Sequence, residues 1–237
     1  MKAFVTGRRS RPLTPLLVSL IASSTLFGCS VDEPVPVPTA SVRWVGGAPS
    51  GPFEEDLWVQ AMREGELAYA TAVNNSNFTD PSMASSWHEE HVRWFAKTAA
   101  RRLDDGTAYV ILGPRPFTPL AVEVAASGEE ATITGCAGDM AFRPAVDDNE
   151  SRWPQPFEFR LELGSDGERR IVSAAGLDEA RMLSTGETLT DDYCSSVRIA
   201  HGEFDPVPDL HALQKLRGSD VVSPPQPSPS FAVEVPQ

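Results

Sequence analysis

The chain has 237 residues, enough for one hydrophobic core or at most two small domains. Acidic residues outnumber basic ones by 33 to 20, and the resulting net charge of −13 argues against nucleic acid as a partner. The apolar fraction of 41% is ordinary for a globular protein, so we expect a folded body.

The N-terminus has the pattern of an export signal. Residues 1–12 contain four basic residues and no acidic one, and residues 13–27 are apolar or small and uncharged. Fifteen helical residues extend roughly 22 Å, which is shorter than the ~30 Å hydrocarbon layer of a membrane. Residues 1–28 are therefore predicted to be a signal peptide that is removed, and not a permanent span.

The signal ends in Leu26-Phe27-Gly28, and Cys29 follows. This stretch resembles the bacterial lipobox, in which leucine at −3 and a small residue at −1 precede a cysteine that becomes acylated, although Phe27 is larger than usual at −2. The resemblance implies a lipoprotein held on the outer face of the cell membrane through lipid on Cys29. The alternative is an ordinary secretory signal followed by an unmodified Cys29. Without the four signal-peptide cations the chain carries −17, so attachment would depend on the acyl chains rather than on charge.

Both ends of the mature chain are rich in proline. Pro34, Pro36 and Pro38 alternate with other residues, which favours polyproline II, and we expect residues 29–50 to be a tether. Residues 224–230 contain four prolines, and residues 207–237 are predicted to form a short helix and a disordered tail.

The body, residues 51–206, begins with two helical patterns. Pro52, followed by acids at positions 54–56, predicts a helix start, and apolar residues recur with helical spacing as far as Val73. Asp80-Pro81 predicts the start of a second helix, whose apolar stripe continues to Leu103.

After Gly106 the pattern changes to the two-residue period of strands. Strands are predicted at 109–112, 120–126, 131–137, 157–163 and 170–174, with turns at 127–129 and 165–167. This order predicts an α+β fold in which two N-terminal helices pack in a curved antiparallel sheet.

The element order is similar to that of the NTF2-like superfamily of cystatin-like rolls. The stretches 122–124 and 131–136 also resemble secreted lipoproteins of high-GC Gram-positive bacteria with this fold. The resemblance covers roughly residues 53–175, and the sixty or so residues that follow are not required by the basic fold. It implies a cone-shaped pocket and a function that is either enzymatic (isomerase, dehydratase) or purely one of binding.

Cys136 and Cys194 remain once Cys29 is set aside, an even number in an oxidising compartment. We predict that they form a disulfide that joins the C-terminal extension to the sheet. A catalytic thiol is the alternative, but no base partner is evident near Cys136.

Other chemical motifs are weak. His88 and His91 are three residues apart, whereas the zinc-protease motif needs four, so no metal site is predicted. Ser195, His201 and Asp205 are the residue types of a hydrolase triad but lack the surrounding glycine elbow. We therefore predict no catalytic residues and no cofactor.

The helical stripes carry five residues that would line a pocket if they faced inward, or belong to the core otherwise: Trp58, Tyr69, Trp87, His91 and Trp94. We expect a non-enzymatic module that binds an unknown protein or small molecule at the membrane surface. The alternative is a small hydrolase, isomerase or dehydratase that uses His91 as its base.

Overall fold

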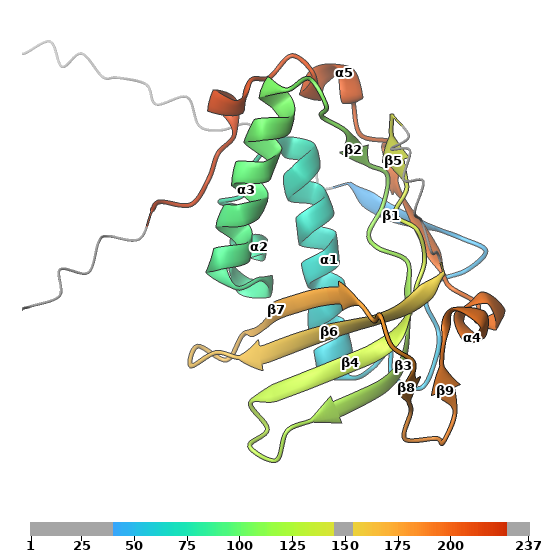
Figure 1. Cartoon of the computed structure of the whole chain (residues 1–237). Helices are drawn as coiled ribbons and strands as arrows, with labels where there is room; N and C mark the ends of the chain where they lie inside the picture. The colour runs from blue at the N-terminus through green and yellow to red at the C-terminus, as the bar shows by residue number, and fades with distance from the viewer. Residues whose placement is uncertain (1–39, 145–153, 227–237) are drawn as a thin grey trace, which may run out of the picture. The chain divides into compact units, whose positions relative to one another are not determined.

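The computed structural model describes residues 40–144 and 154–226 (Figure 1). These residues all belong to one compact unit, Thr39–Gln237. The predicted signal peptide, Cys29 and most of the predicted tether lie outside the described residues, as do residues 227–237 of the predicted tail. Of the helices in the described part, none has the length and apolar character needed to cross a membrane.

Helix α1 spans Leu57–Asn75 and begins later than the proline pattern predicts. Asp56 is its N-cap, and the Asp56 carboxylate accepts hydrogen bonds from the backbone of Trp58 (2.7 Å) and Val59 (3.4 Å). The backbone amides of the first helical turn have no partner within the helix, and the Asp56 carboxylate accepts from them. Pro52 has no side-chain acceptor, so the helix starts after Asp56 and not at Pro52. The helix ends at Ser76, which adopts the left-handed conformation with φ 51°.

The second predicted helix is interrupted, which corrects the sequence-based prediction. Helix α2 spans Pro81–Ser86, and α3 spans Glu89–Asp104. Between them Trp87 is extended and forms a parallel bridge with Ile171, and the His88 amide donates to the Ile171 carbonyl at 3.0 Å. Pairing with a distant strand therefore prevails over a local pattern that favours one continuous helix.

The main sheet has four antiparallel strands in the order β3-β4-β6-β7. Their bounds are Phe117–Val124, Glu130–Ala137, Gln155–Leu163 and Arg169–Gly176. Three smaller antiparallel pairs join β2 (Val110–Ile111) to β5 (Phe142–Arg143), β8 (Arg181–Met182) to β9 (Thr188–Leu189), and β1 (Ser41–Val45) to β10 (His201–Asp205). The predicted α+β class with antiparallel sheets is confirmed.

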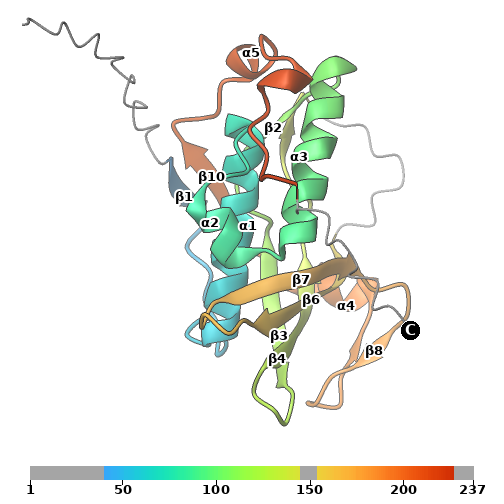
Figure 2. The ribbon, with the colours of Figure 1, turned by 90° about the vertical axis from the view of Figure 1, so that its left-hand side faces the viewer.

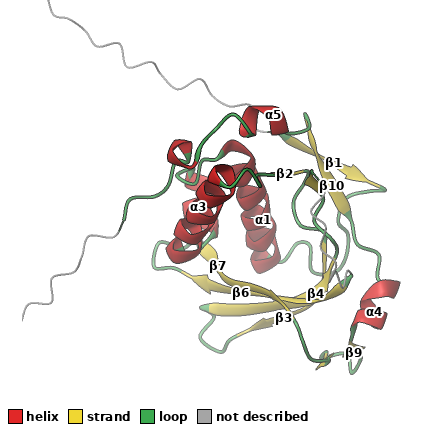
Figure 3. Cartoon of the chain, turned by 45° about the horizontal axis from the view of Figure 1, so that its top comes forward, coloured by secondary structure: helices red, strands yellow, loops and turns green. Residues whose placement is uncertain are grey.

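Helices α1 and α3 lie on the same face of this sheet (Figures 1 and 3). The core between helices and sheet is built from residues that are at most 2% exposed: Val59, Met62, Met83, Val92, Ala96, Ile133, Phe159, Leu161 and Ile171. Burying the apolar faces of both layers against each other is what holds an α+β domain together.

Cys136 of β4 and Cys194 of helix α4 (Asp191–Ser196) form a disulfide with an S–S distance of 2.02 Å. Both cysteines are fully buried in a small cluster with Ala121, Leu183 and Leu189. The predicted pairing is therefore present, and it attaches the C-terminal extension to the sheet.

The predicted tether is too long at its C-terminal end. Residues 41–45 form β1, which pairs with β10 so that Ser41 lies opposite Asp205. A strand whose partner lies about 160 residues away leaves no local turn signal, which is why the sequence pattern missed it.

The predicted tail is also ordered farther than expected. It contains helix α5 (Leu210–Leu213) and the short 3-10 helix η1 (Gly218–Asp220), beside α3 in Figure 2. Val222 then bonds to the chain after α1, accepting from the Phe78 amide at 2.8 Å and donating to the Ser76 carbonyl at 2.9 Å. These backbone bonds and the packing of Val221 on the core hold a segment whose composition alone predicts disorder.

Candidate functional site

A cavity of about 520 Å³ opens where α1, α3 and β7 meet the loop between β2 and β3. The residues that line it come from these four segments and from the connection between α2 and α3, which supplies Trp87: Glu66, Tyr69, Trp87, His91, Trp94, Phe95, Arg115 and Ala174. We call this the Glu66 cavity. Its volume is in the range of small-molecule pockets.

Glu66 and Arg115 form a buried ion pair in this cavity. Glu66 is 3% exposed, and its Oε2 atom accepts from Arg115 Nε at 3.2 Å. The Arg115 guanidinium also lies over the Phe157 ring, 4.9 Å from its centroid. Burial raises the pKa of the Glu66 carboxyl, and the nearby charges of Arg115 and Arg63 offset only part of that effect. The pair thus places a carboxylate and a guanidinium in a pocket whose other lining is mainly aromatic.

Aromatic rings form the walls. Phe95 lies at their centre, with its ring centroid 4.5 Å from that of Tyr69 and 5.0 Å from that of Trp87. Trp87 is fixed by its Nε1 atom, which donates to the Gly65 carbonyl at 2.8 Å. A Cβ on Gly65 would lie 2.5 Å from Ile171 Cδ1, so the absence of a side chain allows this close packing against α1.

His91 is oriented by a backbone contact. Its Nε2 atom lies 2.8 Å from the Val172 carbonyl oxygen. A carbonyl can only accept, so Nε2 carries a proton in this contact. The neighbouring His88 is exposed and stands at the N-cap of α3. Across residues 40–144 and 154–226, no group of three or more potential ligands is placed to hold a metal ion.

Two features of the cavity are suited to binding a small-molecule ligand. The Tyr69 hydroxyl makes no hydrogen bond to any of the described residues, and burial raises the pKa of this phenol. Trp94 is 59% exposed although it lines the cavity, so its indole presents apolar surface to solvent. Tyr69 is half-buried, and a hydroxyl that lines a cavity without a protein partner can donate to or accept from a ligand atom.

Four of the five predicted pocket residues meet in this cavity: Tyr69, Trp87, His91 and Trp94. Trp58 does not line it and belongs to the hydrophobic core, the alternative stated for these residues. It lies eleven residues before Tyr69, about 16 Å along the same helix face, where it is 6% exposed beneath the Arg169 guanidinium. Helical spacing identifies which face of a helix points inward, but not where along the helix axis a pocket opens.

Four further residues line the cavity and were not predicted from the sequence: Glu66, Phe95, Arg115 and Ala174. Glu66 carried a usable signal, because it lies four residues after Met62 and three before Tyr69, on the apolar stripe of α1. A carboxylate at such a position is normally paired. Arg115 comes from a loop and carried no comparable signal.

The serine, histidine and aspartate of the weak triad motif are not assembled as a triad. The Ser195 hydroxyl donates to the Asp191 carbonyl at 3.0 Å, and the Ser196 hydroxyl donates to the Tyr193 carbonyl at 2.7 Å. Both hydroxyls therefore bond to backbone carbonyls of their own helix, α4.

Comparisons of the chain with protein-family models, with curated proteins and with solved structures find no match.

Proposed function

We propose that this protein is an extracytoplasmic lipoprotein, attached to the outer face of the cell membrane through Cys29, and that its folded domain binds a small molecule in the Glu66 cavity. The attachment rests on the sequence of residues 1–29. The binding function rests on the structure.

One observation carries the binding proposal: an open cavity of about 520 Å³ holds a buried ion pair, Glu66–Arg115, and a tyrosine hydroxyl that no described residue engages. Polar groups at the base of an aromatic pocket are the usual composition of a small-molecule site. A purely structural core would be filled by side chains at this position.

We also propose that the domain is a variant of the NTF2-like roll. The order of its elements supports this, since the helices precede an antiparallel meander and lie on one of its faces. The β1–β10 and β8–β9 pairs and the disulfide-linked α4 are additions to the basic roll.

The enzymatic alternative rests on His91 sharing the cavity with Glu66. His91 Nε2 is engaged by the Val172 carbonyl, and Glu66 is engaged by Arg115. Among the described residues no carboxylate is hydrogen-bonded to His91, as would be usual for a histidine base that is oriented by an acid. The geometry favours binding over catalysis.

The binding proposal is tested by filling the cavity. Ala174 lines it, whereas Ala175 is exposed on the opposite side of the same strand, so Ala174→Trp and Ala175→Trp form a matched pair. The full chain would be purified from membranes of its own host, and small molecules released by denaturation would be identified by mass spectrometry. We expect a compound that accompanies the wild type and Ala175→Trp but not Ala174→Trp. The same compounds on all three proteins, with folding verified by circular dichroism, would overturn the proposal.

The attachment is tested separately. Intact-mass measurement of the membrane fraction should show a chain that begins at Cys29 and carries a diacylglyceryl increment. Cys29→Ser should release the protein or block its maturation. An unmodified mature chain would contradict the lipoprotein proposal and leave the binding proposal standing.

A further inference from the structure

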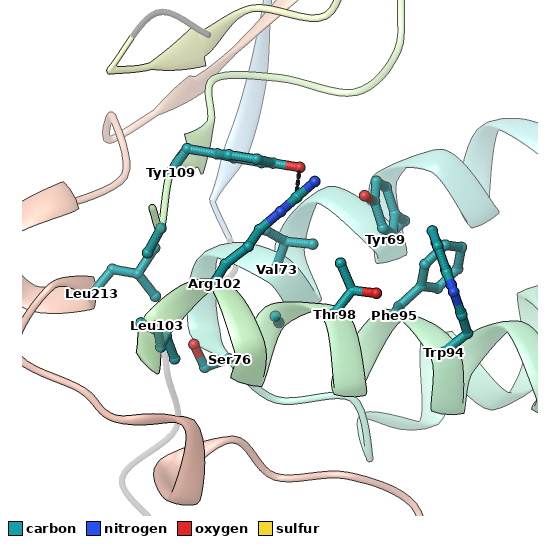
Figure 4. Close-up of a pocket in the computed structure, with 12 residues that line it drawn as sticks. Tyr69, Val73, Ser76, Trp94, Phe95, Thr98, Arg102, Leu103, Tyr109 and Leu213 are labelled. Carbon is teal, nitrogen blue, oxygen red and sulfur yellow. Dashed lines mark hydrogen bonds between the residues drawn. The ribbon is translucent and has the colours of Figure 1, made fainter. Parts of the chain in front are cut away.

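A second, smaller cavity adjoins the Glu66 cavity. It is a crevice of about 50 Å³ between α1 and α3, closed at one end by Tyr109 and by Leu213 of α5 (Figure 4). Tyr69, Trp94 and Phe95 line both cavities. The two spaces are therefore neighbours across a wall of three aromatic side chains, one of which, Trp94, is 59% exposed.

The two cavities differ in chemistry. The Glu66 cavity contains the ion pair and His91, whereas the crevice is lined mainly by small and apolar side chains: Val73, Ala99, Leu103, Ala108 and Leu213. Its polar atoms are few and come from Ser76, Thr98 and the Arg102–Tyr109 pair, in which Arg102 donates to the tyrosine hydroxyl. A molecule that occupied both spaces would need a polar part and an apolar part.

Tyr69 stands at the junction. Its ring packs on Phe95 with centroids 4.5 Å apart, and Figure 4 shows it between the Trp94–Phe95 pair and the Arg102–Tyr109 pair. Its hydroxyl has no partner among the described residues and is available to a ligand atom at this point. If one ligand occupied both cavities, the atoms that join its polar and apolar parts would lie beside Tyr69.

The charges define the polar part. Glu66 disfavours an anion, as does the net charge of −13, and Arg115 beside Glu66 disfavours a cation. An ion pair that is neutral as a unit can bind a hydroxylated group, because hydroxyls both donate and accept. The exposed indole of Trp94 adds a flat apolar surface of the kind that packs against a ring.

We propose that the ligand of the Glu66 cavity is a neutral amphiphile, with a sugar or polyol head beside Glu66 and Arg115 and a short apolar arm that passes Tyr69 into the crevice between α1 and α3. This inference rests on the proposed binding function and specifies the class of ligand.

The test uses alkyl β-D-glucosides as probes of this chemistry. Methyl, butyl and hexyl β-D-glucoside, below their micelle-forming concentrations, would be titrated calorimetrically into the mature chain carrying Cys29→Ser, which needs no detergent. We expect binding to tighten about fourfold per methylene from methyl to butyl, which is the gain from transferring a methylene out of water. The gain should level off by hexyl because the crevice is small.

The crevice is isolated by a second matched pair of variants. Thr98 lines the crevice but not the Glu66 cavity, whereas the adjacent Lys97 is exposed and lines neither of the two. Thr98→Phe should abolish the gain with chain length and leave the affinity for methyl β-D-glucoside unchanged. Lys97→Phe should keep the whole series as in the wild type, and circular dichroism would verify folding of both.

The outcomes separate this inference from the proposed function. Methyl β-D-glucoside binding with no gain for butyl overturns the apolar arm, and an unchanged gain in Thr98→Phe overturns its assignment to the crevice. Failure of all three glucosides overturns the neutral head group. The proposed binding function is judged by the other experiment. It stands, whatever the glucosides do, if a compound co-purifies with the wild type and not with Ala174→Trp.

Discussion

Breaking the Cys136–Cys194 disulfide should lower the stability of the fold substantially. The cysteines are 58 residues apart in sequence. In the chain-entropy account a closed loop of that length destabilises the unfolded state by about 4 kcal/mol. For a domain near 200 residues this corresponds to a melting temperature roughly 8 to 16 °C lower after reduction.

The assay is equilibrium unfolding in urea with and without reductant, followed by circular dichroism. Reduction of the wild type keeps both sulfur atoms and isolates the cross-link, whereas Cys136→Ala/Cys194→Ala also empties space in the buried cluster around Leu183 and Leu189. The double variant should therefore be less stable than the reduced wild type and insensitive to reductant. A difference below about 1 kcal/mol between oxidised and reduced wild type would refute the entropic reasoning.

Three further predictions follow from the electrostatics and capping. Burial raises the pKa of Glu66 above its unfolded value of 4.5, so the folded state binds the proton more tightly and the unfolding free energy should fall as the pH rises from 4.5 through that raised pKa. In denaturant titrations the unfolding free energy of Glu66→Gln should not show this fall with pH. If the difference in unfolding free energy between the wild type and Glu66→Gln is the same at every pH, the fall is not due to Glu66. The Asp166 pKa is lowered from 3.8 to about 2, chiefly by the hydrogen bonds from Arg170, so its stabilising effect is complete above pH 3.8 and is lost as the pH falls through about 2. NMR titration should show the Asp166 pKa returning toward 3.8 in Arg170→Gln, and no movement would rule out the ion pair as its cause. Asp56→Ala removes the N-cap of α1 and should cost about 1 kcal/mol in urea unfolding, whereas Asp56→Asn, which keeps an accepting oxygen, should cost much less; equal losses would refute the cap.

The candidate site was only partly accessible from the sequence. Tyr69, Trp87, His91 and Trp94 were selected because helical spacing places them on inward faces, and the structure brings these four to one cavity. The same spacing selected Trp58, which faces inward three turns below the opening. Periodicity reports direction around a helix axis, and only the packing of neighbouring elements decides where along that axis a space remains.

The Glu66–Arg115 ion pair shows a second limit of prediction from the sequence, which is that partners far apart in the chain share no local pattern. Glu66 stands out on an apolar stripe once its partner is known, but that partner, Arg115, is 49 residues away in a loop between two strands. No local pattern connects the two positions. The pairing exists because the chain brings the β2–β3 loop against α1.

The sequence by itself determined the features that depend on neighbouring residues. These are the α+β class and the antiparallel hairpins around residues 127–129 and 165–167. The pairing of the two cysteines, 58 residues apart, was predictable by counting, since only two remained once Cys29 was set aside. Only the tertiary structure decided the break at Trp87, the β1–β10 pair and the docking of Val222 after α1. In each of these three cases backbone hydrogen bonds from a distant segment outweigh a local preference, because buried amides and carbonyls must be paired wherever partners are found. The Glu66 cavity also depends on the tertiary structure, since its walls come from five segments that meet only in the folded chain.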